Sequence, residues 1–126
     1  EVPLVEGTLD TLLEKARLAM RERRYMAPAD NSALLYYRSA LKVDPTNGEA
    51  RDGLTRLAGL ALSRFNDAMT AGRYDQAATD LADLKVAEPG DARVGPLEAR
   101  LLQAEVTSAF AASGFARAAT RVISSV

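Results

Sequence analysis

The chain has 126 residues, of which 48% are hydrophobic and 26% are charged, and a formal net charge of −1. This composition is typical of one globular domain and not of a disordered chain, and the near-zero charge argues against generic binding to nucleic acid, which requires a strongly basic surface. There is no cysteine and no histidine, which excludes disulfides, thiolate nucleophiles, serine–histidine pairs and the usual zinc ligands.

The first predicted element is a helix that begins after Thr8. Apolar or small residues recur at three- and four-residue spacing from Leu9 to Met20, which is the periodicity of one helical face. Thr8 has a side chain suited to the N-cap position, so we expect a helix from Leu9 to about Arg23. The many Lys and Arg residues of this helix have two alternative interpretations: a solvated charged face, or a surface that binds an acidic peptide or an anionic surface.

Residues 26–32 interrupt the helical pattern. Pro28 is expected to stop the first helix, because proline cannot continue it. Asp30 or Asn31 is then expected to cap a second helix, which ends near Val43. The loop is longer than a helical hairpin requires, so it either carries function or is a tolerated insertion.

The next turn ends in the pattern of a capping box, with Thr46 followed three residues later by Glu49. We expect a long helix from this point to about Ala71. Gly53 and Gly59 lie inside it. Each either weakens the helix by roughly 1 kcal/mol relative to alanine or lets a neighbouring helix approach closely.

The remaining sequence predicts three more helices. Apolar residues have helical spacing in Tyr74–Val86, and Gly72 is suited to end the preceding helix because glycine adopts left-handed backbone angles without a steric clash. The next helix is expected to begin at Asp91 or at Gly95, which precedes a proline. Phe115–Val126 is expected to form the last helix.

One sequence pattern occurs three times, in Ala19–Tyr25, Ala68–Ala78 and Ala109–Ala119. In each copy a small residue, a large apolar residue and an aromatic residue occupy the same relative positions. Each copy joins the end of one predicted helix to the start of the next, which predicts a helical hairpin. We therefore expect an all-α fold in which residues 1–126 form a single repeat domain. Its three antiparallel hairpins are expected at about 8–44, 46–88 and 91–126.

Two stretches of the chain resemble the tetratricopeptide repeat (TPR) family. Ala33–Pro45 is similar to the second helix of such a repeat with its terminal proline, and Gly72–Pro89 resembles the same segment of the next repeat. The resemblance implies hairpins stacked in a right-handed superhelix. The chain departs from the family in the bulky Phe65, where a small residue is usual, and in the greater length of its repeats.

A second resemblance concerns the loop residues Ala27–Asn31 and the Tyr-Tyr-Arg that follows. They look like repeat segments of proteobacterial envelope proteins, including some energy transducers of the TonB type. This implies a periplasmic or cell-envelope location, with the cytoplasm as the alternative. The chain begins with Glu1, so we expect a processed protein or a fragment. No apolar run approaches the roughly 20 residues that cross a bilayer, so membrane attachment is expected only through segments outside this chain.

The TPR resemblance implies that a partner binds in a concave groove lined by the first helix of each hairpin. The side chains assigned to this groove are long polar and apolar ones, a mixture that suits a peptide, and they extend to Leu62 and Phe110. Tyr36 is added because Tyr25 and Tyr37 align with core positions, which turns Tyr36 outward. The candidate partner-binding residues are Arg17, Met20, Arg21, Tyr36, Asn66, Met69, Thr70, Gln103 and Thr107.

The expected function is therefore a protein–protein interaction module that binds a peptide or protein segment in this groove. The alternative is a structural spacer or oligomerisation unit of a larger bacterial envelope protein. Val122, Ile123 and Val126 favour the alternative, because they form an apolar face without a polar capping helix and could support self-association. No nucleic-acid partner and no cofactor is expected.

The sequence does not predict an enzyme. Its carboxylates are scattered, whereas general acid–base catalysis needs two of them held close together in a cleft. Asp80 and Asp83 are neighbours on a predicted helix, but we expect that face to be exposed to solvent. No catalytic and no metal-binding residue is therefore assigned.

Overall fold

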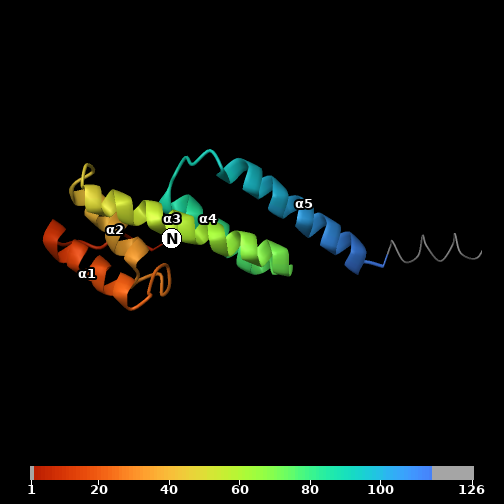
Figure 1. Cartoon of the computed structure of the whole chain (residues 1–126), viewed down its shortest axis with the longest axis horizontal. Coiled ribbons are helices and arrows are strands. Elements are labelled where there is room, and N and C mark those ends of the chain that lie inside the picture. Colours follow the sequence, from red (N-terminus) through yellow and green to blue (C-terminus); the bar gives the residue numbers. More distant parts are fainter. Residues whose placement is uncertain (1, 115–126) are drawn as a thin grey trace, which may run out of the picture.

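The computed structural model describes residues 2–114, which form helices and connecting turns and contain no β-strand (Figure 1). The expectation of an all-α fold is therefore confirmed for this part of the chain. The helices are α1 (Leu9–Arg21), α2 (Ala33–Val43), α3 (Gly48–Ala71), α4 (Tyr74–Ala87) and α5 (Val94–Ala112). None of them is both long enough and apolar enough to cross a membrane.

Each helix packs mainly on its neighbours in the chain: α1 on α2, α2 on α3, α3 on α4 and α4 on α5. The 24-residue α3 is the longest. Its first part lies beside the α1–α2 pair, and α4 runs back along it, whereas α5 extends away from the other helices (Figure 1). The described helices therefore form a sequential array in which α3 connects the two ends.

Two copies of the repeated sequence pattern form the same helix-ending turn. Arg23 after α1 has φ 60° and Gly72 after α3 has φ 73°, so both residues are left-handed. In each turn the following amide donates to an alanine carbonyl of the preceding helix, Ala19 in the first turn and Ala68 in the second, at 2.8 Å in both. This is the pattern of a Schellman C-cap. It ends α1 at Arg21, slightly earlier than expected.

The N-caps of α1, α2 and α3 are side chains that accept a hydrogen bond from a backbone amide of the first turn. Thr8 caps α1 as expected, with Oγ1 3.2 Å from Thr11 N. The cap of α2 is Ser32, whose Oγ accepts from Leu35 N at 3.2 Å, so the expectation of Asp30 or Asn31 is wrong.

The expected capping box of α3 is also wrong. The cap is Asn47, whose Oδ1 accepts from Ala50 N at 2.9 Å. Thr46 instead donates its hydroxyl to Asp44 Oδ1 at 2.8 Å, within the preceding turn. Glu49 points to another helix, where it pairs with an arginine of α1.

The core is built from side chains of all five helices. Tyr37 of α2 and Phe65 of α3 are among its largest fully buried members. A Cβ atom at Gly53 would lie 2.5 Å from Tyr37 Cε2, which is closer than real contacts allow, so this glycine lets α2 and α3 approach. A Cβ at Gly59 would meet nothing within 4 Å. Gly53 therefore lets a neighbouring helix approach closely, whereas Gly59 only weakens the helix.

The helix α5 begins at Val94, between the two expected positions, and has Gly95 in its first turn. Its buried residues are only Leu97 and Leu101, and it packs mainly on α4. The predicted last helix, Phe115–Val126, lies outside the described residues. The same holds for the predicted self-association residues Val122, Ile123 and Val126.

Candidate functional site

The nine candidate partner-binding residues lie on four helices. Arg17, Met20 and Arg21 share α1, Asn66, Met69 and Thr70 share α3, and Gln103 and Thr107 share α5. None of the main helix contacts joins two of these three helices directly. Six of the nine are exposed: Arg17, Arg21, Asn66, Thr70, Gln103 and Thr107. Met20 and Met69 are half-buried and pack against the core. The groove itself stays a prediction.

Tyr36, the ninth residue, is not turned outward. Its side chain is only 9% exposed, and its hydroxyl donates to Asn31 Oδ1 at 2.6 Å. Asn31 also accepts from Arg24 Nη1 at 2.9 Å, which fixes the loop of residues 26–32 against α2. The expectation of an outward Tyr36 is wrong, because its ring belongs to the core and the loop residue Asn31 binds its hydroxyl. Tyr37 is buried, as expected.

The Arg17 side chain pairs with a residue of another helix. Its guanidinium donates two hydrogen bonds to the Glu49 carboxylate, both of 2.6 Å, and so connects α1 to the start of α3. The bidentate contact raises the pKa of Arg17 and lowers that of Glu49. A partner that used Arg17 would have to displace this pair.

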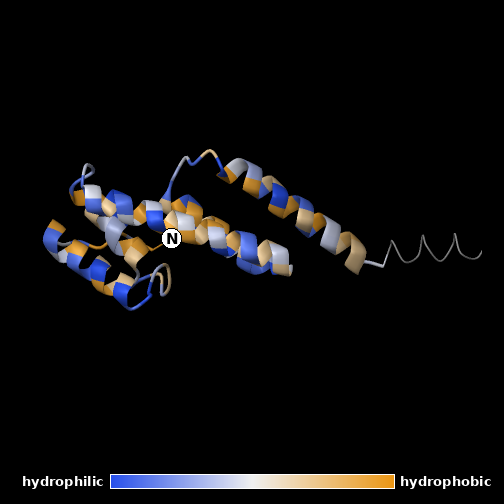
Figure 2. Cartoon of the chain, viewed as in Figure 1, coloured by the Kyte–Doolittle hydropathy of each residue, from blue (hydrophilic) through white to orange (hydrophobic). Residues whose placement is uncertain are grey.

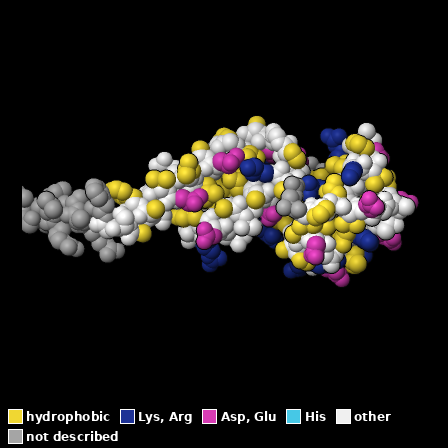
Figure 3. All heavy atoms as spheres, turned by 180° about the vertical axis from the view of Figure 1, so that it is seen from behind, with side chains coloured by type: hydrophobic (Ala, Val, Ile, Leu, Met, Phe, Trp, Pro, Cys, Tyr) yellow, Lys and Arg dark blue, Asp and Glu magenta, His cyan; other side chains and the backbone are white. Residues whose placement is uncertain are grey.

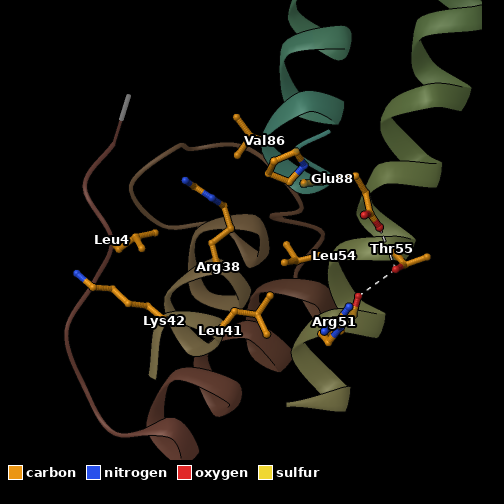
Figure 4. Close-up of a pocket in the computed structure, with 11 residues that line it drawn as sticks. Leu4, Arg38, Leu41, Lys42, Arg51, Leu54, Thr55, Val86 and Glu88 are labelled. Carbon is orange, nitrogen blue, oxygen red and sulfur yellow. Dashed lines mark hydrogen bonds between the residues drawn. The ribbon is translucent and has the colours of Figure 1, made fainter. Parts of the chain in front are cut away.

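The structure contains a pocket that the sequence did not predict, and we call it the basic pocket (Figure 4). It is a cavity of about 410 Å³ between α2, α3, the end of α4 and the extended N-terminal segment. Its lining is formed by Leu4, Arg38, Leu41, Lys42, Arg51, Leu54, Thr55, Val86, Ala87, Glu88 and Pro89. In the view of Figure 4, Arg38 lies between Leu4 and Leu54, and Lys42, Arg51 and Glu88 lie further out.

Local contacts hold the walls of the basic pocket in place. Val5 N donates to Ser39 Oγ of α2 at 2.9 Å, which fixes the N-terminal segment and so positions Leu4. On the opposite wall, the Thr55 hydroxyl lies 3.0 Å from Glu88 Oε1 and 3.1 Å from the Arg51 carbonyl oxygen, and its single hydrogen serves one of them at a time. The contact between Thr55 and Glu88 connects α3 to the end of α4.

The charge of the basic pocket is positive, with the basic residues Arg38, Lys42 and Arg51 against the single acidic residue Glu88. The side chains of Lys42 and Arg51 form no hydrogen bond or ion pair within residues 2–114. They lie on opposite sides of Leu41 (Figure 4). Two cations that have no partner among the described residues and lie on either side of Leu41 can bind anionic groups.

Sequence reasoning missed the basic pocket for a structural reason. Its residues come from three helices and a terminal segment, and only the folded chain brings them together. The one local signal is the spacing of Arg38 and Lys42, four residues apart and therefore on the same side of α2. Nothing in the sequence connected these two residues with Arg51.

A second cavity, of about 480 Å³, lies between α4 and α5. Leu81, Leu101 and Leu102 contribute apolar surface to it, and Lys85 Nζ lies 3.7 Å from Glu98 Oε2 at its edge. Hydrophobic side chains gather at the surface where α5 lies beside α4 (Figure 3). Hydrophobic residues continue along α5 beyond this cavity (Figure 2). The exposed large hydrophobic residues of α5 are Leu102 at the cavity and Val106 and Phe110 beyond it, which are 64%, 57% and 50% exposed.

A carboxylate on α4 is buried, contrary to expectation. Asp80 is only 2% exposed; its Oδ1 accepts from Gln76 Nε2 at 3.0 Å, and its Oδ2 has no hydrogen-bond partner among the described residues. Burial, together with the charge of Asp80, raises the pKa of the half-buried Asp83 to about 6, while Arg64 lowers it. No three acidic side chains in residues 2–114 lie close enough to hold a metal ion.

Comparison with known proteins adds no assignment, because the chain matches no family model, no curated protein and no solved structure. The resemblance to TPR proteins therefore rests on the quoted residues alone.

Proposed function

We propose that the chain is a protein-binding module of the helical-repeat type, which takes up a segment of a partner protein. The observation that supports this function is the basic pocket, which combines apolar side chains with charged ones. Its volume of about 410 Å³ lies within the range of roughly 300–1,000 Å³ that is usual for binding cavities. The two matching helix-ending turns support a repeat architecture of the TPR type.

The chemistry of the pocket favours binding over catalysis. Its ionisable side chains are those of two arginines, one lysine and one glutamate. A general acid–base reaction would need a second group poised to exchange a proton near neutral pH. Recognition needs only the features seen here, which are apolar surface and a few placed charges. The expected concave groove is the alternative place for the same function.

Two threonines of α3 offer a matched test of whether the partner binds in the basic pocket or in the expected groove. Thr55 lines the basic pocket and Thr70 belongs to the expected groove; both are exposed, and both lie about 3 Å from the carbonyl oxygen four residues earlier. A Thr55→Tyr substitution should fill the pocket. Peptides selected on the unmodified chain from a random displayed library should lose at least about tenfold in affinity for Thr55→Tyr and keep their affinity for Thr70→Tyr.

Thermal unfolding of both variants serves as the control for folding. Selected peptides that lose affinity only for Thr70→Tyr would move the site to the expected groove. If the library yields no peptide that depends on either threonine, the proposal of a peptide-binding module is wrong.

A second function is favoured by the apolar row on α5. Leu102, Val106 and Phe110 recur at four-residue spacing and are at least half exposed. Large exposed apolar rows are typical of surfaces that another protein covers. A structural spacer or oligomerisation unit would use this row and would be unaffected by Thr55→Tyr.

The resemblance of residues 27–31 to envelope proteins supports a periplasmic or cell-envelope location for either function, with the cytoplasm as the alternative. The net charge of −1 supports a protein partner over nucleic acid.

A further inference from the structure

We infer that the segment bound in the basic pocket is acidic and carries one large apolar side chain between its carboxylates. This inference rests on the proposed function, because it names the chemistry of the partner at the same site. Three observations carry it: the apolar side chains that face the same space in the pocket, the position of the cations Lys42 and Arg51, and the lack of a partner for these two cations among the described residues.

The apolar side chains of the pocket fit one side chain of the partner. Leu41, Leu54 and Val86 point toward the same space from α2, α3 and α4 (Figure 4). Leu54 is 6% exposed, so it forms part of the floor, while Leu41 and Val86 are half-buried and still accessible. A leucine or phenylalanine placed here would bury apolar surface on three helices at once, which is favourable because that surface leaves water.

The cations fit carboxylates on both sides of this side chain. Lys42 and Arg51 lie on opposite sides of Leu41, and neither has an ion pair among the described residues (Figure 4). A guanidinium can bind a carboxylate through two parallel hydrogen bonds, and an ammonium binds it as a point charge. The single carboxylate of the pocket, that of Glu88, lies against Thr55 and leaves the pocket with an excess of positive charge.

The separation of the two cations favours a peptide over a fatty acid. A fatty acid has one carboxylate at one end of its chain, so it could satisfy only one of the cations. A peptide can place an aspartate or glutamate before and after an apolar residue and so satisfy both. The net charge that such a segment carries would also speed its approach to the positive pocket at low ionic strength.

The test uses short synthetic peptides with blocked ends. The first has a central leucine flanked by aspartates and glutamates, the second has asparagines and glutamines in place of the acids, and the third has glycine in place of leucine. Each is titrated into the isotope-labelled chain while amide chemical shifts are recorded. The acidic leucine peptide should shift the amides around Lys42, Arg51 and Thr55 and should bind at least about tenfold more tightly than either of the others.

Two variants of the chain test the charges, and a third is the control. Lys42→Gln and Arg51→Gln should each weaken the acidic leucine peptide about two- to fivefold, as expected for single ion pairs near water, and the loss should shrink at high salt. Arg100→Gln changes an exposed arginine of α5 outside the pocket and should leave the affinity unchanged. An equal loss in Arg100→Gln would show non-specific attraction and overturn the inference.

The failures of the inference and of the proposed function are distinguishable. If the neutral leucine peptide binds as tightly as the acidic one and shifts the same amides, the pocket binds protein segments but the inference about acidity is wrong. If dodecanoate binds there more tightly than the acidic peptide, the ligand is a lipid-like amphiphile and the inference is wrong. If the acidic peptide shifts no amide of the pocket, the inference is wrong. This holds even if the displayed library yields a peptide whose affinity depends on Thr55.

Discussion

Two glycines of α3 have different surroundings although they look alike in the sequence. A side chain at Gly53 would overlap the buried Tyr37 ring at 2.5 Å, whereas a side chain at Gly59 would be in open space. Both residues have ordinary helical backbone angles, so neither is needed for a left-handed conformation. What distinguishes them is the contact between α2 and α3, which is absent from any local sequence pattern.

The two glycine-to-alanine substitutions should therefore have opposite effects. Gly59→Ala should raise the free energy of unfolding by about 0.5–1 kcal/mol, because alanine is the better helix former. Gly53→Ala should lower it by about 1–3 kcal/mol, because the Tyr37 ring or the helix backbone has to move. Chemical denaturation of both variants measures the two changes. Equal stabilisation by both would show that the contact between Tyr37 and α3 is loose.

The fold opposes the ionisation of Asp83, whose pKa is raised to about 6. Burial is the main cause of its raised pKa, the charge of Asp80 adds to it, and Arg64 acts in the other direction. A carboxyl with a raised pKa stabilises the fold in its protonated form. Its contribution is therefore fully present below its unfolded value of 3.8 and is lost as the pH rises through about 6.

Replacing Asp83 should remove this pH dependence. Asp83→Asn is expected to be more stable than the unmodified chain at pH 7, where Asp83 is charged, and close to it in stability at pH 4. The difference between the two unfolding free energies, measured at several pH values, should grow between about pH 4 and 6. A difference that is constant over this range would mean that the charge of Asp83 is well solvated.

At the scale of the helices, the sequence predicted the existence and type of α1–α5 and most of their ends. The roles of Thr8 as an N-cap and of Gly72 as the end of α3 were predicted correctly. The Thr8 side chain suits a cap, the Gly72 backbone suits a left-handed turn, and no nearby residue was an alternative for either role. The caps of α2 and α3 were not predicted correctly, because each cap lies in a run of residues that can all cap a helix. Tertiary contacts decide there: Asn31 is engaged by Tyr36, so Ser32 becomes the cap.

The same limit applies to the candidate site. The expected groove was assigned from the positions of residues on single helices, and the structure leaves these positions mostly exposed but separated. The basic pocket depends instead on Arg51 of α3 and Lys42 of α2 lining the same cavity beside the end of α4. Periodicity predicts which face of a helix is apolar, but not which charged residues of different helices meet beside it.

At the scale of the whole molecule, the helices form a linear array, since each packs mainly on its neighbours in sequence. The middle helix α3 contacts both α2 and α4, and it buries residues along its length from Ala50 to Ala68. The last described helix packs chiefly on α4 and buries only Leu97 and Leu101. Such one-dimensional arrays are stabilised by the sum of their successive contacts.

The thin attachment of α5 has a consequence for amide hydrogen exchange. Backbone hydrogen bonds exchange through local opening when few buried contacts oppose it, and through global unfolding when many do. Amides of α3 between Leu57 and Phe65 should therefore exchange slowest, and those of α5 beyond Leu102 much faster. Leu101→Ala should accelerate exchange throughout α5 and leave the rates in α1–α3 unchanged. Acceleration in all helices would instead show that α5 opens only when the whole array does.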